Sequence, residues 1–133
     1  MVFSLARLGL AVVLLAAAVV AGCGHKGPRV APVGPNDVIV AFGDSLTFGT
    51  GATEAESYPA VLAQLIGRKV VRAGIPGEVT AASLQRLQAV IDENRPALVI
   101  VCLGGNDLLR RVDDAEIASN LREIVKIIQA SGS

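Results

Sequence analysis

The 133-residue chain has no tryptophan, one tyrosine and a single histidine, His25. Imidazole is the usual group for proton transfer and metal binding near neutral pH, so one histidine leaves few such chemistries open. The chain also has no excess of charge of either sign. Its 12 basic and 12 acidic side chains balance to zero, which argues against a nucleic-acid-binding protein. The two cysteines, Cys23 and Cys102, provide no disulfide framework.

The first 22 residues contain only one charged side chain, Arg7, ahead of an uncharged run rich in Leu, Val and Ala. A positive start, a short apolar run and then small residues are typical of a secretory signal peptide. The apolar run covers residues 8–22, which is shorter than the roughly 20 residues that a membrane-spanning helix needs. We therefore predict that residues 1–22 are a signal peptide.

The predicted signal peptide ends at Val20-Ala21-Gly22-Cys23, which resembles a bacterial lipobox, where a peptidase cuts before a cysteine whose thiol carries lipid. Cys23 is therefore the expected site of lipid attachment. The alternative is an ordinary signal peptide or membrane anchor with an incidental cysteine. Residues 23–36 are rich in glycine and proline, which suits a flexible tether.

These segments together predict a lipid-anchored protein of the cell envelope. If the cell has two membranes, the expected place is the periplasmic face of the outer membrane, because Gly24 rather than an aspartate follows Cys23.

The remaining residues alternate between short apolar runs and stretches of helical periodicity. Thr80 is the expected cap of the second helix, and Asp113 with Glu116 forms a capping-box pattern before the third. This order predicts an α/β fold with a parallel sheet covered on both faces. The strands are expected at 38–42, 69–73 and 97–103, and the helices at 58–66, 81–94 and after 113.

Three glycine-containing loops follow the three predicted strands: 43–45, 74–77 and 104–107. Ligands of such sheets bind beyond the carboxyl ends of the strands, so these loops are expected to meet. A serine at a strand-to-helix turn, Ser45, is then presented at a helix N-terminus, where its own N–H can face a developing oxyanion. Gly77 and Asn106 offer two further donors, a backbone N–H and a side-chain amide. The pattern predicts a nucleophile with an oxyanion hole.

The same three segments resemble the blocks of a known family. Residues 42–46 (Phe-Gly-Asp-Ser-Leu), 73–78 (Ala-Gly-Ile-Pro-Gly-Glu) and 104–107 (Gly-Gly-Asn-Asp) are similar to the first three blocks of the GDSL, or SGNH, hydrolases. The likeness is to the bacterial thioesterase I, lysophospholipase and arylesterase group. It implies a flavodoxin-like three-layer α/β/α fold, with Ser45 as nucleophile and Ser45, Gly77 and Asn106 as oxyanion donors. It implies no metal or organic cofactor.

Asp44 and Asp107 stand next to predicted site residues. Adjacent side chains point in different directions, so we expect both carboxylates to form hydrogen bonds that stabilise the loops. Cys102 lies in an apolar run and is expected to act as a small hydrophobic strand residue.

The family also carries a catalytic Asp and His in an Asp-x-x-His segment, and this sequence has none. His25 lies in the predicted tether. We therefore expect residues 37–133 to be the N-terminal portion of the hydrolase domain, with the edge of the third strand unpaired. A truncated chain and a degenerate relative are the two explanations.

The prediction for function is a serine hydrolase of the cell envelope that acts on a small acyl ester or thioester, contacts the membrane through its lipid and binds no nucleic acid. The chain alone is expected to be inactive for lack of the base. The alternative is a non-catalytic envelope protein with a binding role on the same scaffold.

Overall fold

The computed structural model describes residues 31–133. The predicted signal peptide, Cys23, His25 and most of the predicted tether lie outside the described residues. Within the tether, residues 31–36 form neither helix nor strand.

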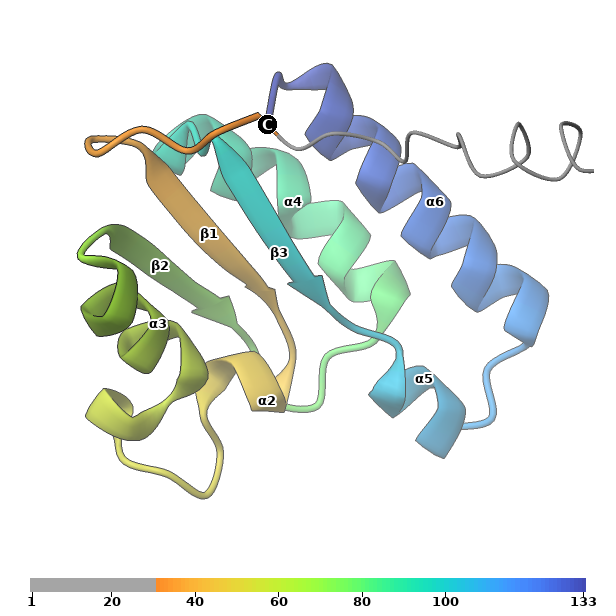
Figure 1. Cartoon of the computed structure of the whole chain (residues 1–133). Coiled ribbons are helices and arrows are strands. Elements are labelled where there is room, and N and C mark those ends of the chain that lie inside the picture. The colour runs from red at the N-terminus through yellow and green to blue at the C-terminus, as the bar shows by residue number, and fades with distance from the viewer. Residues whose placement is uncertain (1–30) are drawn as a thin grey trace, which may run out of the picture. The chain divides into compact units, whose positions relative to one another are not determined.

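The centre of the fold is a parallel sheet of three strands: β1 (Val38–Gly43), β2 (Lys69–Gly74) and β3 (Leu98–Cys102), in the order β2-β1-β3. Gly43, the last residue of β1, pairs with Gly74 of β2 and with Cys102 of β3. The carboxyl ends of the strands are therefore level, and Figure 1 shows all three arrowheads pointing to one end of the sheet. The loops that follow the strands start from this common edge.

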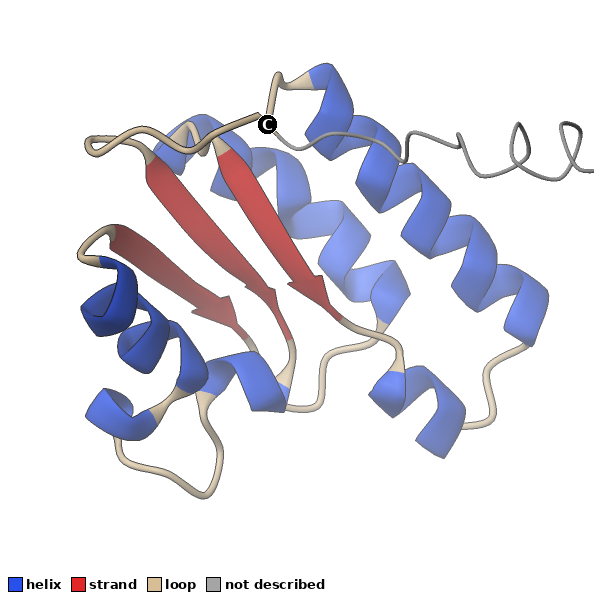
Figure 2. Cartoon of the chain, viewed as in Figure 1, coloured by secondary structure: helices blue, strands red, loops and turns tan. Residues whose placement is uncertain are grey.

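Each strand is followed by helix, which gives the alternation that the sequence predicts (Figure 2). The helices expected at 58–66 and 81–94 have those bounds within a residue, because their apolar residues repeat at helical spacing over several turns. The helical elements are α2 (Ser45–Phe48), the 3₁₀ helix η1 (Glu54–Glu56), α3 (Tyr58–Ile66), α4 (Thr80–Asn94), α5 (Gly105–Leu109) and α6 (Asp114–Ala130).

The main apolar core lies between the sheet and the helices α4 and α6. Phe42 and Val40 of β1, Leu87 of α4 and Ile124 of α6 are completely buried there. Figure 1 shows α4 and α6 side by side across this face. Burial of each of these four side chains contributes roughly 1.5 to 3 kcal/mol to the stability of the fold.

The opposite face of the sheet is covered by α2, which contacts β2 and β1, and by α3, which contacts β2. Helices on both faces of a parallel sheet make the predicted three-layer α/β/α architecture. Within residues 31–133, β3 pairs with β1 alone, so its outer edge is unpaired, as the sequence predicts.

One predicted helix cap differs from the structure, and a second is confirmed without its capping box. Thr80 is the first residue of α4 and does not cap it; Val79 occupies the cap position. The reason is tertiary, since the N–H and the hydroxyl of Thr80 both donate to Asp107 on another loop. Asp113 does cap α6 by accepting from the Ala115 N–H at 2.9 Å, but within the described residues no bond to Glu116 completes the capping box.

Candidate active site

Ser45 is the first residue of α2 and stands directly after the end of β1. Asp44 caps this short helix, with Oδ1 accepting from the Leu46 N–H at 3.0 Å. The Asp44 N–H donates to the carbonyl of Cys102 at 3.3 Å, which ties the turn to β3. The turn is thus fixed at both ends, and it presents the half-buried Ser45 at a helix N-terminus.

The close contact between α2 and β2 depends on Gly74. A Cβ at this position would lie 2.6 Å from the carbonyl carbon of Thr47 and 2.7 Å from the carbonyl oxygen of Asp44. Real Cβ atoms do not approach backbone so closely, so only glycine lets the helix that carries Ser45 rest on the end of β2.

The second loop carries Gly77 and is held against the first. The Ile75 N–H donates to the carbonyl of Gly43 at 3.0 Å, and the Glu78 N–H turns back to the carbonyl of Ile75 at 3.2 Å. Gly77 has a φ of 76°, in the left-handed region that glycine adopts without strain. Among residues 31–133, no protein acceptor takes the backbone N–H of either Ser45 or Gly77. Both donors are therefore available to a ligand.

Asn106 joins the three loops. Its Nδ2 donates to the carbonyl of Glu78 at 2.9 Å and lies 3.4 Å from Oδ2 of Asp44. Glu78 follows Gly77 in the chain, and Asp44 precedes Ser45. The side-chain amide of Asn106 therefore contacts the residue next to each of the two backbone N–H donors, those of Ser45 and Gly77. The structure thus brings together the three residues that the sequence predicts for the nucleophile and the oxyanion hole.

A hollow of about 520 Å³ opens beside Ser45. Its apolar part consists of leucines that are largely exposed: Leu46 at 67%, Leu108 at 63% and Leu109 at 83%. Gly77 does not line the hollow; its carbonyl accepts from Nη2 of Arg110, at the end of α5, at 2.8 Å. The lining residues are Asp44, Ser45, Leu46, Gly105, Asn106, Leu108 and Leu109.

Asp107 has a structural task, as the sequence predicts. Its buried carboxylate accepts from the Thr80 N–H at 3.0 Å and from the Thr80 hydroxyl at 2.6 Å, while Asn120 donates to that hydroxyl at 3.1 Å. This chain of bonds fastens α5 to the start of α4 and to α6. The carboxylate of Asp107 thus accepts hydrogen bonds from Thr80, and the carboxylate of Asp44 accepts one from the Leu46 N–H as the cap of α2. Both carboxylates stabilise the loops, as the sequence predicts.

The sequence comparisons identify the family. A model of the GDSL-like Lipase/Acylhydrolase family matches residues 41–133. Esterase TesA from Pseudomonas aeruginosa is 33% identical over 100 residues, which cover 71% of this chain and 50% of that protein. The chain belongs to the GDSL-like lipase/acylhydrolase family.

Two further relatives agree with this assignment. Thioesterase 1/protease 1/lysophospholipase L1 from Escherichia coli is 33% identical over 99 residues, covering 73% of this chain and 48% of that protein. The crystal structure of AlinE4, an SGNH-hydrolase family esterase, matches with a TM-score of 0.67 at 44% identity, covering 74% of this chain and 56% of that one. The chain spans about half the length of the curated relatives it matches.

The described part of this GDSL-family domain lacks some groups that a hydrolase or a metalloenzyme uses. Residues 31–133 contain no histidine. Over the same residues, no cluster of three or more His, Cys, Asp or Glu side chains is placed to hold a metal ion. Within this range, too, every helix is too short or too polar to cross a membrane.

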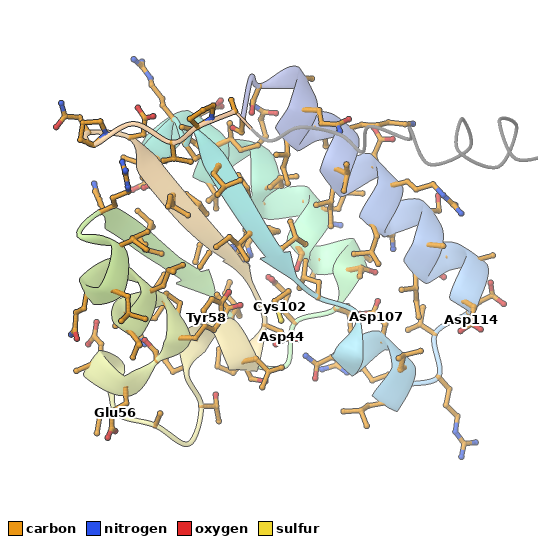
Figure 3. The ribbon with its side chains drawn as sticks, viewed as in Figure 1. Asp44, Glu56, Tyr58, Cys102, Asp107 and Asp114 are labelled. Carbon is orange, nitrogen blue, oxygen red and sulfur yellow. The ribbon has the colours of Figure 1, made fainter. Side chains whose placement is uncertain are left out.

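Tyr58 lies close to the first loop of the site. Figure 3 shows it with Asp44 and Cys102 near the carboxyl end of the sheet. Its hydroxyl is 3.0 Å from Oγ1 of Thr47, a buried residue of α2. Burial raises the pKa of Tyr58, and the negative charge of Asp44 adds to this, while the bond to Thr47 acts in the opposite direction.

The sequence-based prediction of the site missed one ion pair. Glu78 and Arg86 form a forked pair with a shortest N–O distance of 2.7 Å beside the second loop. Their spacing of eight residues carries no local signal, because Glu78 stands in a loop and Arg86 two turns into α4. Only the fold brings these two side chains together.

Proposed function

We propose that the whole protein hydrolyses carboxylic esters or thioesters through an acyl-enzyme on Ser45. The observation that carries this proposal is the arrangement of donors around the nucleophile. The backbone N–H groups of Ser45 and Gly77 have no acceptor among residues 31–133, and the Asn106 amide contacts the neighbours of both. Such donors stabilise the charge that develops on a carbonyl oxygen during acyl transfer.

In the proposed reaction the Ser45 hydroxyl attacks the acyl carbon and passes its proton to a base. The carbonyl oxygen becomes an oxyanion that accepts from the three donors. Collapse of the tetrahedral intermediate expels the alcohol or thiol, which takes up a proton. Water then attacks the acyl-serine by the same route, releasing the acid and restoring Ser45. One oxyanion donor typically lowers the barrier by about 3 kcal/mol.

Histidine, the usual general base of such a reaction, is absent from residues 31–133. We propose that an Asp-x-x-His segment elsewhere in the whole protein supplies it, as the resemblance to the family implies. The same observation favours the alternative function, a non-catalytic envelope protein that binds its ligand on this scaffold. Turnover that depends on Ser45 separates the two functions.

We propose that the acyl group of the substrate is apolar. The support is the row of exposed leucines, Leu46, Leu108 and Leu109, in the hollow beside Ser45. Burying each CH₂ of an acyl chain against such a surface contributes about 0.8 kcal/mol. The names of the relatives, an esterase and a thioesterase/lysophospholipase, accord with this substrate class.

The proposal is tested by labelling the whole protein with a fluorophosphonate probe, which reacts only with an activated hydroxyl. Ser45→Ala should abolish labelling. Ser131→Ala, at the end of α6, is the matched control and should label fully. Asn106→Ala should keep the labelled residue but lower kcat for p-nitrophenyl butyrate by about a hundredfold to a thousandfold, with little change in KM. Full labelling of Ser45→Ala contradicts the proposed nucleophile.

We also propose that the protein is anchored in the cell envelope by lipid on Cys23. The support is the lipobox-like end of the apolar run at residues 20–23. In cells grown with a fatty-acid probe, Cys23→Ala should lose the label and accumulate as precursor, while the matched control Cys102→Ala should keep it. Equal labelling of the two variants contradicts the anchor.

A further inference from the structure

We propose that Arg86 and Glu78 are positioning residues that hold the oxyanion donors of all three loops in one fixed arrangement. The inference rests on the proposed function, because it concerns the geometry of the same site. Neither side chain lines the hollow beside Ser45, so both act through the backbone and through Asn106.

The guanidinium of Arg86 binds two backbone segments at once. Its Nη2 donates to the carbonyl of Ala73 at 3.0 Å and lies 3.2 Å from the carbonyl of Gly43. Gly43 is the residue before the Asp44–Ser45 turn, and Ala73 is the residue before the loop that carries Gly77. One planar cation therefore fixes the starting points of the first and second loops.

The orientation of Arg86 is itself fixed from two sides. Nε donates to Oε1 of Glu78 at 2.8 Å and Nη2 donates to Oε2 at 2.7 Å, which makes a bidentate pair. The guanidinium carbon lies 4.2 Å from the centre of the Phe42 ring, which is completely buried. A cation held over a ring and in a fork has little freedom to rotate, so it can set the position of the carbonyls that it binds.

Glu78 carries the restraint to the third loop. Its carboxylate accepts from Arg86 and, through Oε2, from the Ser83 hydroxyl at 2.6 Å. Its backbone carbonyl accepts from Nδ2 of Asn106 at 2.9 Å. An amide nitrogen has two hydrogens. The carbonyl of Glu78 accepts one of the two hydrogens of Asn106 Nδ2. The second hydrogen has only Oδ2 of Asp44 near it, with 3.4 Å between the heavy atoms, so this hydrogen remains available to an oxyanion.

The energetics of buried ion pairs agree with a positioning role. Removing two charges from water costs about as much as their attraction returns, so a pair of this kind contributes little net stability. What it supplies is a fixed geometry. A displacement of about 1 Å at a catalytic group can lower a rate on the order of a hundredfold, so the geometry of these donors has a large effect on turnover.

The chain contains a matched control for this pair. Arg72 bonds Glu54 at 3.0 Å, donates to the carbonyl of Phe48 at 2.6 Å and lies 4.9 Å from the centre of the Phe48 ring. These are the same chemical partners on the other face of the sheet. The side chain of Arg72 contacts neither Gly77 nor Asn106. A substitution of Arg72 therefore disturbs an ion pair of the same composition without moving the second and third loops of the site.

The experiment measures kcat and KM of the whole protein with p-nitrophenyl butyrate. Arg86→Lys keeps the charge but cannot form the fork, and it should lower kcat about thirtyfold while KM changes less than about threefold. Arg72→Lys, whose carbonyl partner Phe48 ends the short helix that begins with Ser45, should change kcat and KM less than about threefold. In an Asn106→Ala background the loss from Arg86→Lys should shrink to about threefold, since part of its effect passes through Asn106.

Three outcomes overturn the inference. They are an unchanged kcat in Arg86→Lys, the same fold loss in both backgrounds, and an equal loss in Arg72→Lys. Ser83→Ala removes only one hydrogen bond to Glu78 and should lower kcat by a smaller factor, again with little change in KM. This variant replaces Arg86→Lys in the test if Arg86→Lys fails to fold. Ser45→Ala in the same assay tests the proposed function separately: turnover that survives it refutes that function and the positioning role together.

Discussion

The two faces of the sheet carry the same three chemical groups in different settings. On the α4 side, Arg86 lies over Phe42 and pairs with Glu78. On the α2–α3 side, Arg72 lies over Phe48 and pairs with Glu54. The side chains of the first pair are 20% and 7% exposed, whereas Glu54 in the second is 82% exposed. The two clusters differ in burial and in the backbone they bind.

The difference shows that the function of an ion pair depends on its place and not on its composition. Arg72 binds one carbonyl at the end of α2, and water competes for its partner. Arg86 binds the ends of two strands and a carboxylate that water barely reaches. A screened surface pair contributes between 0 and about 1 kcal/mol, while a shielded pair fixes the groups around it.

The largest expected effect tests this comparison on stability. Arg86→Met leaves the carboxylate of Glu78 shielded from water and without its cation, so it should lower the free energy of unfolding by about 3 kcal/mol. Arg72→Met should lower it by less than about 1 kcal/mol. Urea unfolding of the whole protein, followed by circular dichroism, measures both values.

Adding Glu78→Gln to Arg86→Met removes the stranded charge, and we expect it to recover part of the loss. The corresponding double substitution at Glu54 and Arg72 should recover nothing measurable. Equal losses for Arg86→Met and Arg72→Met would show that burial does not distinguish the two pairs.

Much of the fold could be predicted from the sequence, because a strand buried on both faces is a short, continuous run of apolar residues. The run Val38–Phe42 has no polar residue at any position, and the structure forms β1 there with one more residue. From three strands in a parallel sheet it follows that the loops with Ser45, Gly77 and Asn106 share one edge. That placement needed only the alternation of strands and helices and the position of three glycine-rich loops.

The elements that were missed are short or depend on distant partners. The five residues of α5 are too few to show a helical period. Thr80 has the right identity for a cap, but Asp107, 27 residues away, takes its N–H and hydroxyl instead. Val125 is 45% exposed, although its neighbour Ile124 on α6 is completely buried. The described sheet ends at β3, so this flank of α6 has no strand beneath it within residues 31–133.

The positioning pair could not be predicted for the same reason. An arginine two turns into a helix is usually solvated, and nothing near Arg86 in the sequence indicates otherwise. Its role depends on two carbonyls that stand 43 and 13 residues earlier in the chain. The sequence can indicate which residues do chemistry, but the residues that orient them are found only after the fold is known.

The smallest expected effect concerns Tyr58, on the α2–α3 face. Burial raises its pKa above the ordinary value of 10.0, and the hydrogen bond to Thr47 opposes the rise. In the unfolded chain Tyr58 has the ordinary pKa, so the folded state keeps the phenolic proton to a higher pH. Stability from this group is therefore complete below pH 10.0 and is lost as the pH rises through the higher pKa of the folded protein.

Tyr58 is the only tyrosine and the chain has no tryptophan, so absorbance of the tyrosinate reports this single group. Titration should give a pKa above that of free tyrosine, and Thr47→Val should raise it further, because the valine fills the space of threonine but cannot donate to the phenolate. Tyr58→Phe should remove the corresponding loss of stability in alkali. An ordinary pKa in the native protein would show that the α2–α3 face leaves this hydroxyl in water, and the contrast between the two faces would then be greater than the structure indicates.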